Sequence, residues 1–267
     1  MNTDKNLIQS KLFDTATGLK DVNMPENKSN KVSLLDVAAA ESVESLLEVV
    51  RLGSDETAII PFTADSEAVD LHYCPETEIN GYVICNEESM EALVVDPGEV
   101  TTTMIDQIES KAYTLKAILI THSHIHHCRG LKTLMRIYHP DVYASNAKLF
   151  NLVCKKVQDQ QDFQEASFPI RAIAVPGHSQ DSIVYDIDGC LFTGDAFHAG
   201  IIGKTTSAFN AKALFERLKS KLESYPDDSL VFPGHGPPST LGTEKKFNLG
   251  LREGFAESLK ANYDFFV

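Results

Sequence analysis

The sequence predicts an α/β protein in which helices cover the outer faces of two β-layers. Three observations predict it. Short apolar runs of strand length alternate with amphipathic helical segments, the alternation occurs in both halves of the chain, and no repeat of fixed period is visible. The chain has 267 residues, and 43% of them are hydrophobic, which is enough for one large core with a small appendage.

The expected elements begin near residue 57 with short strands separated by polar turns. In chain order they are strands at TAIIPF, GYVIC and ALVVDPG, a helix over about 101–111, strand KAILITH, helix GLKTLMRIY, strand DVYAS and helix AKLFNLVCKKV. A strand near IRAIAVPGH follows, then a hairpin IVYDIDGCLFTGD turning at Asp188 and Gly189, a helix near 210–224 and strand SLVFPGH.

The N-terminal segment has a different composition. Residues 1 to about 30 are polar and predict a loop or a disordered tail. Ser33 opens a helix, because SLLD has the form of a capping box and apolar residues recur at helical spacing before Gly53. We therefore divide the chain into an extension over 1–56 and a main domain over 57–267. The helix has an apolar face that packs either on that domain or on a second subunit, so a homo-oligomer stays open.

Charge and cysteine usage exclude several classes of partner. With 24 basic and 38 acidic residues the net charge is −14, which argues against nucleic acid or an anionic membrane surface as a partner. The N-terminus has no apolar signal segment, and no stretch is long enough to span a membrane. The five cysteines are scattered and form no CxxC pair. These features predict a cytoplasmic protein.

Histidines mark the candidate site. The chain has nine, and four of them lie in THSHIHH, at His122, His124, His126 and His127. Further ligand-type residues, His178, Asp195 and His235, end later strands in PGH, FTGD and PGH. Loops at one edge of a layered sheet converge even when they are far apart in sequence. Because imidazole and carboxylate suit zinc, iron and manganese, the pattern predicts a metal site.

These motifs resemble the metallo-β-lactamase superfamily, whose signature is T-H-x-H-x-D-H. The matching segments are VVDPG, THSHIHHCRG, PGHSQDSI, FTGD and FPGHG, and the correspondence runs from about residue 80 to 248. The closing run PGHGPPSTLGTEKKFN looks most like the short branch of the glyoxalase II (hydroxyacylglutathione hydrolase) group. The resemblance implies a four-layer αββα sandwich, to which this chain adds its N-terminal helical extension.

The resemblance also implies a centre with two divalent metal ions, with zinc expected and iron or manganese as alternatives. It assigns the first metal to three histidines and the second to two histidines and the residue at position 126, and it gives Asp195 a bridging place between them. In this sequence the first set is His122, His124 and His178, and the second is His126, His127 and His235. Asp96 would be an outer carboxylate that orients a ligand histidine.

The implied activity is hydrolysis of a thioester. A metal-bound hydroxide would attack the carbonyl of a small substrate such as S-lactoylglutathione or another glutathione conjugate, and a thiolate would leave. Asp195 and residue 126 would take part in catalysis as well as in binding. Two weaker expectations concern substrate contacts from Lys204, in a G-[KR]-[ST] run, and from His198, just past the GD motif.

The departure from the family pattern is at position 126, where aspartate is expected and this chain has histidine. His126 either still binds the second metal, or turns away and leaves that site weak, or marks a site that only binds metal. Two other functions follow from these outcomes. One is a mono-iron persulfide dioxygenase-like enzyme that uses His122, His178 and Asp195. The other is a non-catalytic metal or oxygen sensor, supported only by the helix over 33–52.

Overall fold

The computed structural model describes residues 67–74 and 78–251 of the chain. The expected strand TAIIPF, the helix over 33–52 and the boundary at residue 56 lie outside the described residues. That boundary stays a prediction. No helix within the described ranges is long and apolar enough to cross a membrane.

The first of two six-stranded sheets holds the N-terminal part of the described chain. Its strand order is β1-β2-β3-β4-β5-β8, antiparallel from β1 to β3 and parallel from β3 to β8. The bounds are β1 Glu67–Cys74, β2 Ile79–Asn86, β3 Glu91–Val95, β4 Thr114–Leu119, β5 Asp141–Ala144 and β8 Lys155–Lys156. The run GYVIC lies in β2 and ALVV in β3, as the sequence predicts.

The second sheet holds the C-terminal part, in the order β16-β15-β12-β11-β10-β9. Its bounds are β9 Gln161–Glu165, β10 Phe168–Ala174, β11 Ile183–Ile187, β12 Cys190–Gly194, β15 Leu230–Pro233 and β16 Ser239–Thr240. The β11–β12 hairpin turns at Asp188 and Gly189, and both residues have positive φ. Two further hairpins project from the sheets, β6 Lys148–Leu149 with β7 Leu152–Val153, and β13 Phe197–His198 with β14 Ile201–Ile202.

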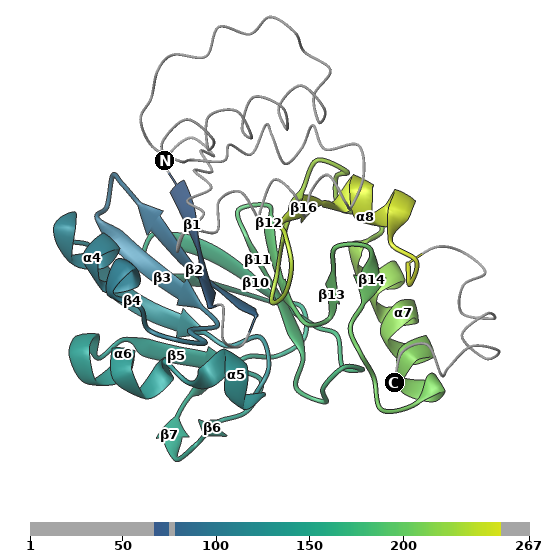
Figure 1. Cartoon of the computed structure of the whole chain (residues 1–267), viewed down its shortest axis with the longest axis horizontal. Helices are drawn as coiled ribbons and strands as arrows, with labels where there is room; N and C mark the ends of the chain where they lie inside the picture. The colour runs from purple at the N-terminus through teal and green to yellow at the C-terminus, as the bar shows by residue number, and fades with distance from the viewer. Residues whose placement is uncertain (1–66, 75–77, 252–267) are drawn as a thin grey trace, which may run out of the picture.

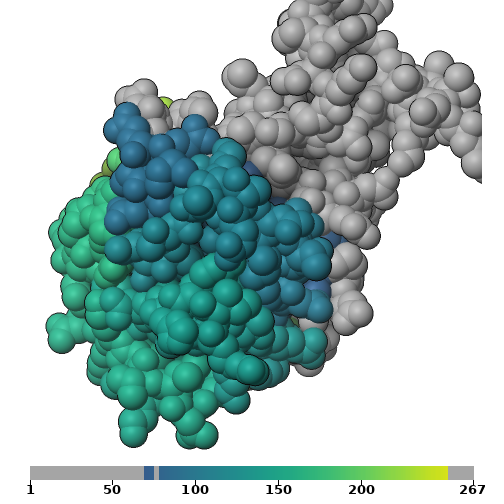
Figure 2. All heavy atoms as spheres, turned by 90° about the vertical axis from the view of Figure 1, so that its left-hand side faces the viewer, coloured from purple at the N-terminus to yellow at the C-terminus, as the bar shows by residue number. Residues whose placement is uncertain are grey.

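Helices cover the outer faces of both sheets (Figure 1). Helices α4 (Thr102–Ser110) and α6 (Leu131–Tyr138) pack on the first sheet, and α7 (Ala208–Leu222) and α8 (Leu241–Phe247) pack on the second. Side chains at the N-caps Thr101, Ser207 and Thr240 accept hydrogen bonds from the first turns of α4, α7 and α8. Figure 2 looks onto the face of the first sheet's helices, which is built from the blue and teal first half of the described chain.

The main core lies between the two sheets. It joins apolar side chains of the first sheet, such as Leu71 and Ile84, to those of the second, such as Phe168 and Ile170. Two more clusters lie between the sheets and their helices, one for each sheet. The molecule is thus a four-layer αββα sandwich, which confirms the predicted fold class.

The expected helix over AKLFNLVCKKV is wrong. This segment forms the β6–β7 hairpin and strand β8. Phe150 and Asn151, between β6 and β7, have φ of 47° and 71°. Two successive residues with positive φ make the type of two-residue turn whose twist matches a hairpin, and they cannot continue a right-handed helix.

Candidate metal centre

The candidate site lies where five strands end. Asp96 follows β3, the histidine loop follows β4, His178 follows β10, Asp195 follows β12 directly, and His235 follows β15. Because β3 and β4 run parallel, as do β12 and β15, their carboxyl ends meet at one edge of each sheet. The two edges face each other, and Ile183 N–H donates to the carbonyl of Thr121 across them, at 2.8 Å.

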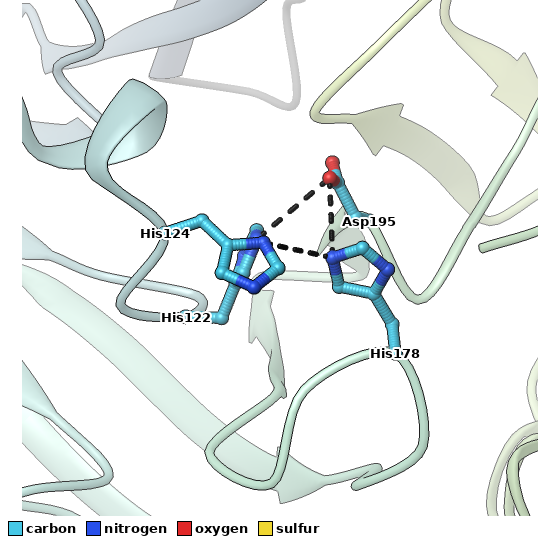
Figure 3. A group of neighbouring side chains, drawn as sticks. All are labelled: His122, His124, His178 and Asp195. Carbon is cyan, nitrogen blue, oxygen red and sulfur yellow. Dashed lines mark hydrogen bonds and ion pairs between the residues drawn. The ribbon is translucent and has the colours of Figure 1, made fainter. Parts of the chain in front are cut away.

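One group of four side chains could hold a metal ion, and it consists of His122, His124, His178 and Asp195. Their rings and carboxylate point toward one another (Figure 3). Nδ1 of His124 lies 3.0 Å from Nε2 of His122 and 3.1 Å from Nε2 of His178. Oδ2 of Asp195 lies 3.7 Å and 3.4 Å from the same two Nε2 atoms. Three imidazoles and one carboxylate are a ligand set that zinc accepts.

A second group shares Asp195 and adds His127 and His235. Nε2 of His127 lies 3.3 Å from Oδ1 of Asp195, and Nε2 of His235 lies 3.5 Å from Oδ2. Asp195 therefore stands between the two groups, which is the position that a bridging carboxylate requires.

Backbone carbonyls orient two of the rings. Nδ1–H of His178 donates to the carbonyl of Lys204 at 2.6 Å, and Nδ1–H of His235 donates to that of Glu78 at 2.7 Å. A carbonyl can only accept, so the proton of each neutral ring is on Nδ1, and the lone pair of Nε2 faces the cluster.

Asp96 holds the histidine loop and the ring of His127 in place by hydrogen bonds. It is buried, and it accepts hydrogen bonds from the backbone N–H of Thr121 at 2.8 Å, from Thr121 Oγ1 at 2.5 Å and from Nδ1–H of His127 at 3.0 Å. These contacts leave Nε2 of His127 facing Asp195. They are the contacts that the orienting role expected for Asp96 needs.

The electrostatics of the cluster favour a charged Asp195 beside a charged His127, and a neutral His122. Burial, followed by the neighbouring His127, lowers the pKa of His122 to about 3. Burial also lowers the pKa of His127, but Asp96 and Asp195 outweigh it and raise that pKa to about 10. Burial raises the pKa of Asp195, yet the facing His127 and His235 outweigh it and hold that pKa far below its usual range. Metal binding at His127 would displace a proton.

Two observations on Asp195 fit a cation. Its Oδ1 atom is buried and, within the described residues, has no hydrogen-bond partner. The charged ring of His127 faces this oxygen, with Nε2 3.3 Å away, and a bound metal ion would take the place of the His127 proton. In addition, a Cβ on Gly234 would lie 2.5 Å from that oxygen and 2.6 Å from Cε1 of His127. The backbone therefore leaves no room here for any side chain beyond those of the cluster.

Three residues that were expected to bind metal or substrate are not members of these groups, namely His126, Lys204 and His198. His126 is exposed on the short helix α5 (Ile125–Cys128), whose buried residues are His127 and Cys128. Successive residues on a helix point about 100° apart, so a ring at 126 diverges from one at 127. Its role as a ligand stays a prediction. Lys204 offers its carbonyl to His178, while its side chain is exposed.

His198 is half-buried beside the cluster, with its ring centroid 6.2 Å from that of His235. Burial lowers the pKa of His198 to about 4. This places it at the rim of the second group, without making it a member.

Sequence reasoning missed three residues that shape the site. Asp181 accepts from the backbone N–H of Ser123 at 3.1 Å and so ties the histidine loop to the PGHSQDSI segment. Asn80 Nδ2 donates to the carbonyls of Pro233 and Gly236, and Tyr82 OH donates to Pro233 at 2.6 Å. Asp181 stands in a motif segment of the sequence, whereas nothing in the sequence marks Asn80 and Tyr82.

Comparison with known proteins decides the family. The model of the metallo-beta-lactamase superfamily matches residues 75–153 and 147–235, which is more than half of the chain. The chain belongs to the metallo-beta-lactamase superfamily.

Within this superfamily the chain is similar to several hydrolases. It is 33% identical over 162 residues to the probable polyketide biosynthesis zinc-dependent hydrolase BaeB of Bacillus velezensis, covering 58% of this chain and 71% of that one. It is 31% identical over 161 residues to the hydroxyacylglutathione hydrolase of Tolumonas auensis, covering 58% of this chain and only 61% of that enzyme. Relatives of this kind confirm the resemblance to the glyoxalase II-like branch.

Solved structures of the superfamily share the fold. A metallo-beta-lactamase from Staphylococcus aureus aligns with a TM-score of 0.65 at 23% identity, over 75% of this chain and 68% of that one. ETHE1 from Myxococcus xanthus aligns with a TM-score of 0.64 at 24% identity, over 73% of this chain and 91% of that one. At such identities the likeness concerns the fold alone.

Proposed function

We propose that this protein is a metal-dependent hydrolase of thioesters, with a small acyl-thiol such as a glutathione conjugate as substrate. The observation that carries the proposal is the group of His122, His124, His178 and Asp195, in which Oδ1 of the ionised Asp195 accepts no hydrogen bond from the described residues. Support for a thioester comes from the similarity to hydroxyacylglutathione hydrolases. Support for zinc comes from the three-imidazole, one-carboxylate set and from the similarity to BaeB.

The residues of this chain divide the work as follows. Bound divalent metal would supply an acidified water and polarise the thioester carbonyl. His122, His124 and His178 would hold the first ion. Asp195 belongs to both groups and would hold the two ions at a fixed distance from each other. The carbonyls of Lys204 and Glu78 keep the Nε2 atoms of His178 and His235 turned inward, so little reorganisation is needed on binding. A thiolate leaves with little help from an acid, because thiols are far more acidic than alcohols.

One observation favours a second candidate, a mono-iron persulfide dioxygenase-like oxidoreductase. His126 lies outside every group, whereas the first group is complete without it. This first group contains His122, His178 and Asp195, the residues that the resemblance assigns to a single iron. A site with one metal would lose nothing by the exchange of aspartate for His126.

Metal analysis combined with two activity assays separates these candidates. The full chain is purified without added metal, and its zinc and iron are counted. Release of free thiol from S-lactoylglutathione and formation of sulfite from glutathione persulfide are then measured. Zinc with thioester hydrolysis supports the first candidate, and one iron per chain with sulfite formation supports the second.

The matched variants are His178→Asn and His139→Asn. His139 is exposed at the end of α6 and belongs to no group. We expect His178→Asn to lower turnover by at least roughly 100-fold, since even outer partners of a metal site carry 10- to 100-fold effects. His139→Asn should leave turnover unchanged. Bound metal with neither activity, or full turnover in His178→Asn, would contradict both candidates.

A further inference from the structure

The second group of the metal centre is one donor short. It contains His127, Asp195 and His235, whereas the family pattern supplies a fourth protein donor to this metal. In the sequence pattern the missing donor is the residue at position 126. Here that residue is an exposed histidine on α5, next to the buried His127, and among the described residues it belongs to no group that could hold a metal.

Another imidazole stands beside this incomplete group. The ring of His198 is half-buried, and its centroid lies 6.2 Å from that of His235. The rings of His127 and His235, which belong to one group, are 5.7 Å apart. Two imidazoles that share one zinc have centroids roughly 5–6 Å apart, given a zinc–nitrogen distance of about 2.0–2.1 Å. His198 therefore stands at nearly the separation of a partner ligand.

The backbone is held at His198 and on its C-terminal side. Asn248 Nδ2 donates to the carbonyls of His198 and Ile201, at 3.2 Å and 3.0 Å. The N–H of Gly200, in the turn of the β13–β14 hairpin, donates to the buried Glu244 at 3.2 Å. Asn248 itself is fully buried and donates to Glu244 at 2.7 Å. The hairpin is thus held by buried polar groups instead of being a free surface loop.

The same hairpin is packed tightly against the segment of Asp195. Gly203 N–H donates to the carbonyl of Ala196 at 2.9 Å, and a Cβ at Gly203 would collide with the carbonyl oxygen of Asp195. His198 and Asp195 are therefore held at a fixed offset. Within the part of the chain that the structure describes, the ring of His198 makes no hydrogen bond, so its nitrogens are not committed to another partner.

We infer that His198 is the fourth ligand of the second metal position, in the place that the family pattern gives to residue 126. The inference deepens the proposed function and rests on its metal centre. Completing the site calls for a rotation of the His198 ring on its fixed backbone, because the ring now lies beside the group. With a neutral imidazole where aspartate is usual, the second ion would be held by three histidines and Asp195. The pair of ions would be one unit more positive.

A set of histidine-to-asparagine variants tests this assignment by counting metal. The full chain is stripped with a chelator, reloaded with zinc and desalted, and the zinc per chain is measured for wild type, His198→Asn, His126→Asn and His139→Asn. We expect two zinc ions in wild type, His126→Asn and His139→Asn, and one in His198→Asn. Titration against a chromophoric chelator should show the weaker zinc bound at least roughly 100-fold less tightly in His198→Asn.

A fold control separates loss of a ligand from loss of structure. His198→Phe keeps the volume of the ring and removes its nitrogens, and the circular dichroism and thermal midpoint of each metal-free variant are compared with wild type. Loss of one zinc in both His198 variants, with an unchanged fold, is the expected result. If either folded His198 variant keeps two tightly bound zinc ions, the assignment is overturned.

Other outcomes would contradict the inference about His198 and leave the proposed hydrolase function unaffected. Loss of the second zinc in His126→Asn but not in His198→Asn would return the role to residue 126. A single zinc in wild type, together with thioester hydrolysis, would also overturn the inference and leave the proposed function standing. Wild type without any bound metal would overturn both.

Discussion

Replacing Asp96 with asparagine removes a charge and one hydrogen-bond acceptor from the base of the histidine cluster. Three donors converge on this carboxylate, the N–H of Thr121 on Oδ1, and the hydroxyl of Thr121 and Nδ1–H of His127 on Oδ2. Asparagine keeps a single acceptor oxygen and presents two N–H donors in place of the other. It can therefore satisfy only one side of this arrangement.

Both orientations of the new amide disturb the site. If its oxygen faces the Thr121 N–H, its amino group faces Nδ1 of His127. That ring must then carry its proton on Nε2, the atom turned toward Asp195. If the amide is flipped, its amino group faces the Thr121 N–H, and a buried donor loses its partner. The first orientation removes a metal ligand, and the second destabilises the loop that carries His122.

The expected magnitude follows from these two costs. Loss of an outer partner of a ligand histidine lowers metal affinity by about 10- to 100-fold, or about 1.4–2.8 kcal/mol. The orphaned N–H lowers the free energy of unfolding by about 1–3 kcal/mol. The second effect should appear in metal-free protein, so the two measurements report on different orientations of the amide.

The assay is a zinc titration against a chromophoric chelator, with urea unfolding of the metal-free protein beside it. The matched control is Asp188→Asn. Asp188 also has a left-handed backbone, with φ of 49° against 46° for Asp96, but it is exposed in a hairpin turn. Asparagine tolerates such a backbone at both places. This account of Asp96 would be refuted if Asp96→Asn bound zinc within two-fold of the control and had the same free energy of unfolding.

Two further predictions concern packing and pH. Gly234→Ala would press on Asp195 Oδ1 and His127, so we expect metal-free protein to lose about 1–3 kcal/mol of unfolding free energy; an unchanged urea midpoint would contradict this. His72 is buried, and burial, against a hydrogen bond with Gln107, lowers its pKa from 6.5 to about 4. Between about pH 6.5 and 4 only the unfolded chain takes up a proton at His72, so lowering the pH over this range should cost wild type about 3 kcal/mol of unfolding free energy. The difference in unfolding free energy between wild type and His72→Gln should therefore change with pH, and a constant difference would refute the prediction.

The sequence predicted the centre of the sheets and the ligand-bearing strand ends well, for a physical reason. Buried parallel strands are continuous apolar runs, and KAILI stops at Thr121 while LVFP stops at Gly234, just before His235. The edge strand β1 was missed, although Asp70 and His72 alternate with apolar residues in the period of two that is typical of a strand. Both polar side chains contact Gln107 of α4, whose Oε1 accepts from Nε2 of His72 and whose Nε2 donates to Asp70. Such tertiary partners leave no trace in the local pattern.

Local spacing was also ambiguous where the structure departs from the prediction. Leu149, Leu152 and Val153 fit a helical face as well as a short hairpin, and no glycine or proline marks the turn at Phe150 and Asn151. The candidate site shows the same limit. The motif predicted that His126 is a ligand, whereas in the structure His126 is exposed on α5. The support of His198 by Glu244 and Asn248 arises only when α8 packs against the hairpin.

The placement of the histidines on two sheets has a consequence for assembly. His122, His124 and His127 come from the first sheet, and His178, Asp195 and His235 come from the second. Neither half of the chain can form the centre alone, so a bound ion would act as a rivet between them and would be captured only after the halves have docked. Closure of the sandwich would then precede and limit the uptake of metal by the folding chain, and release of the metal would require the two halves to separate.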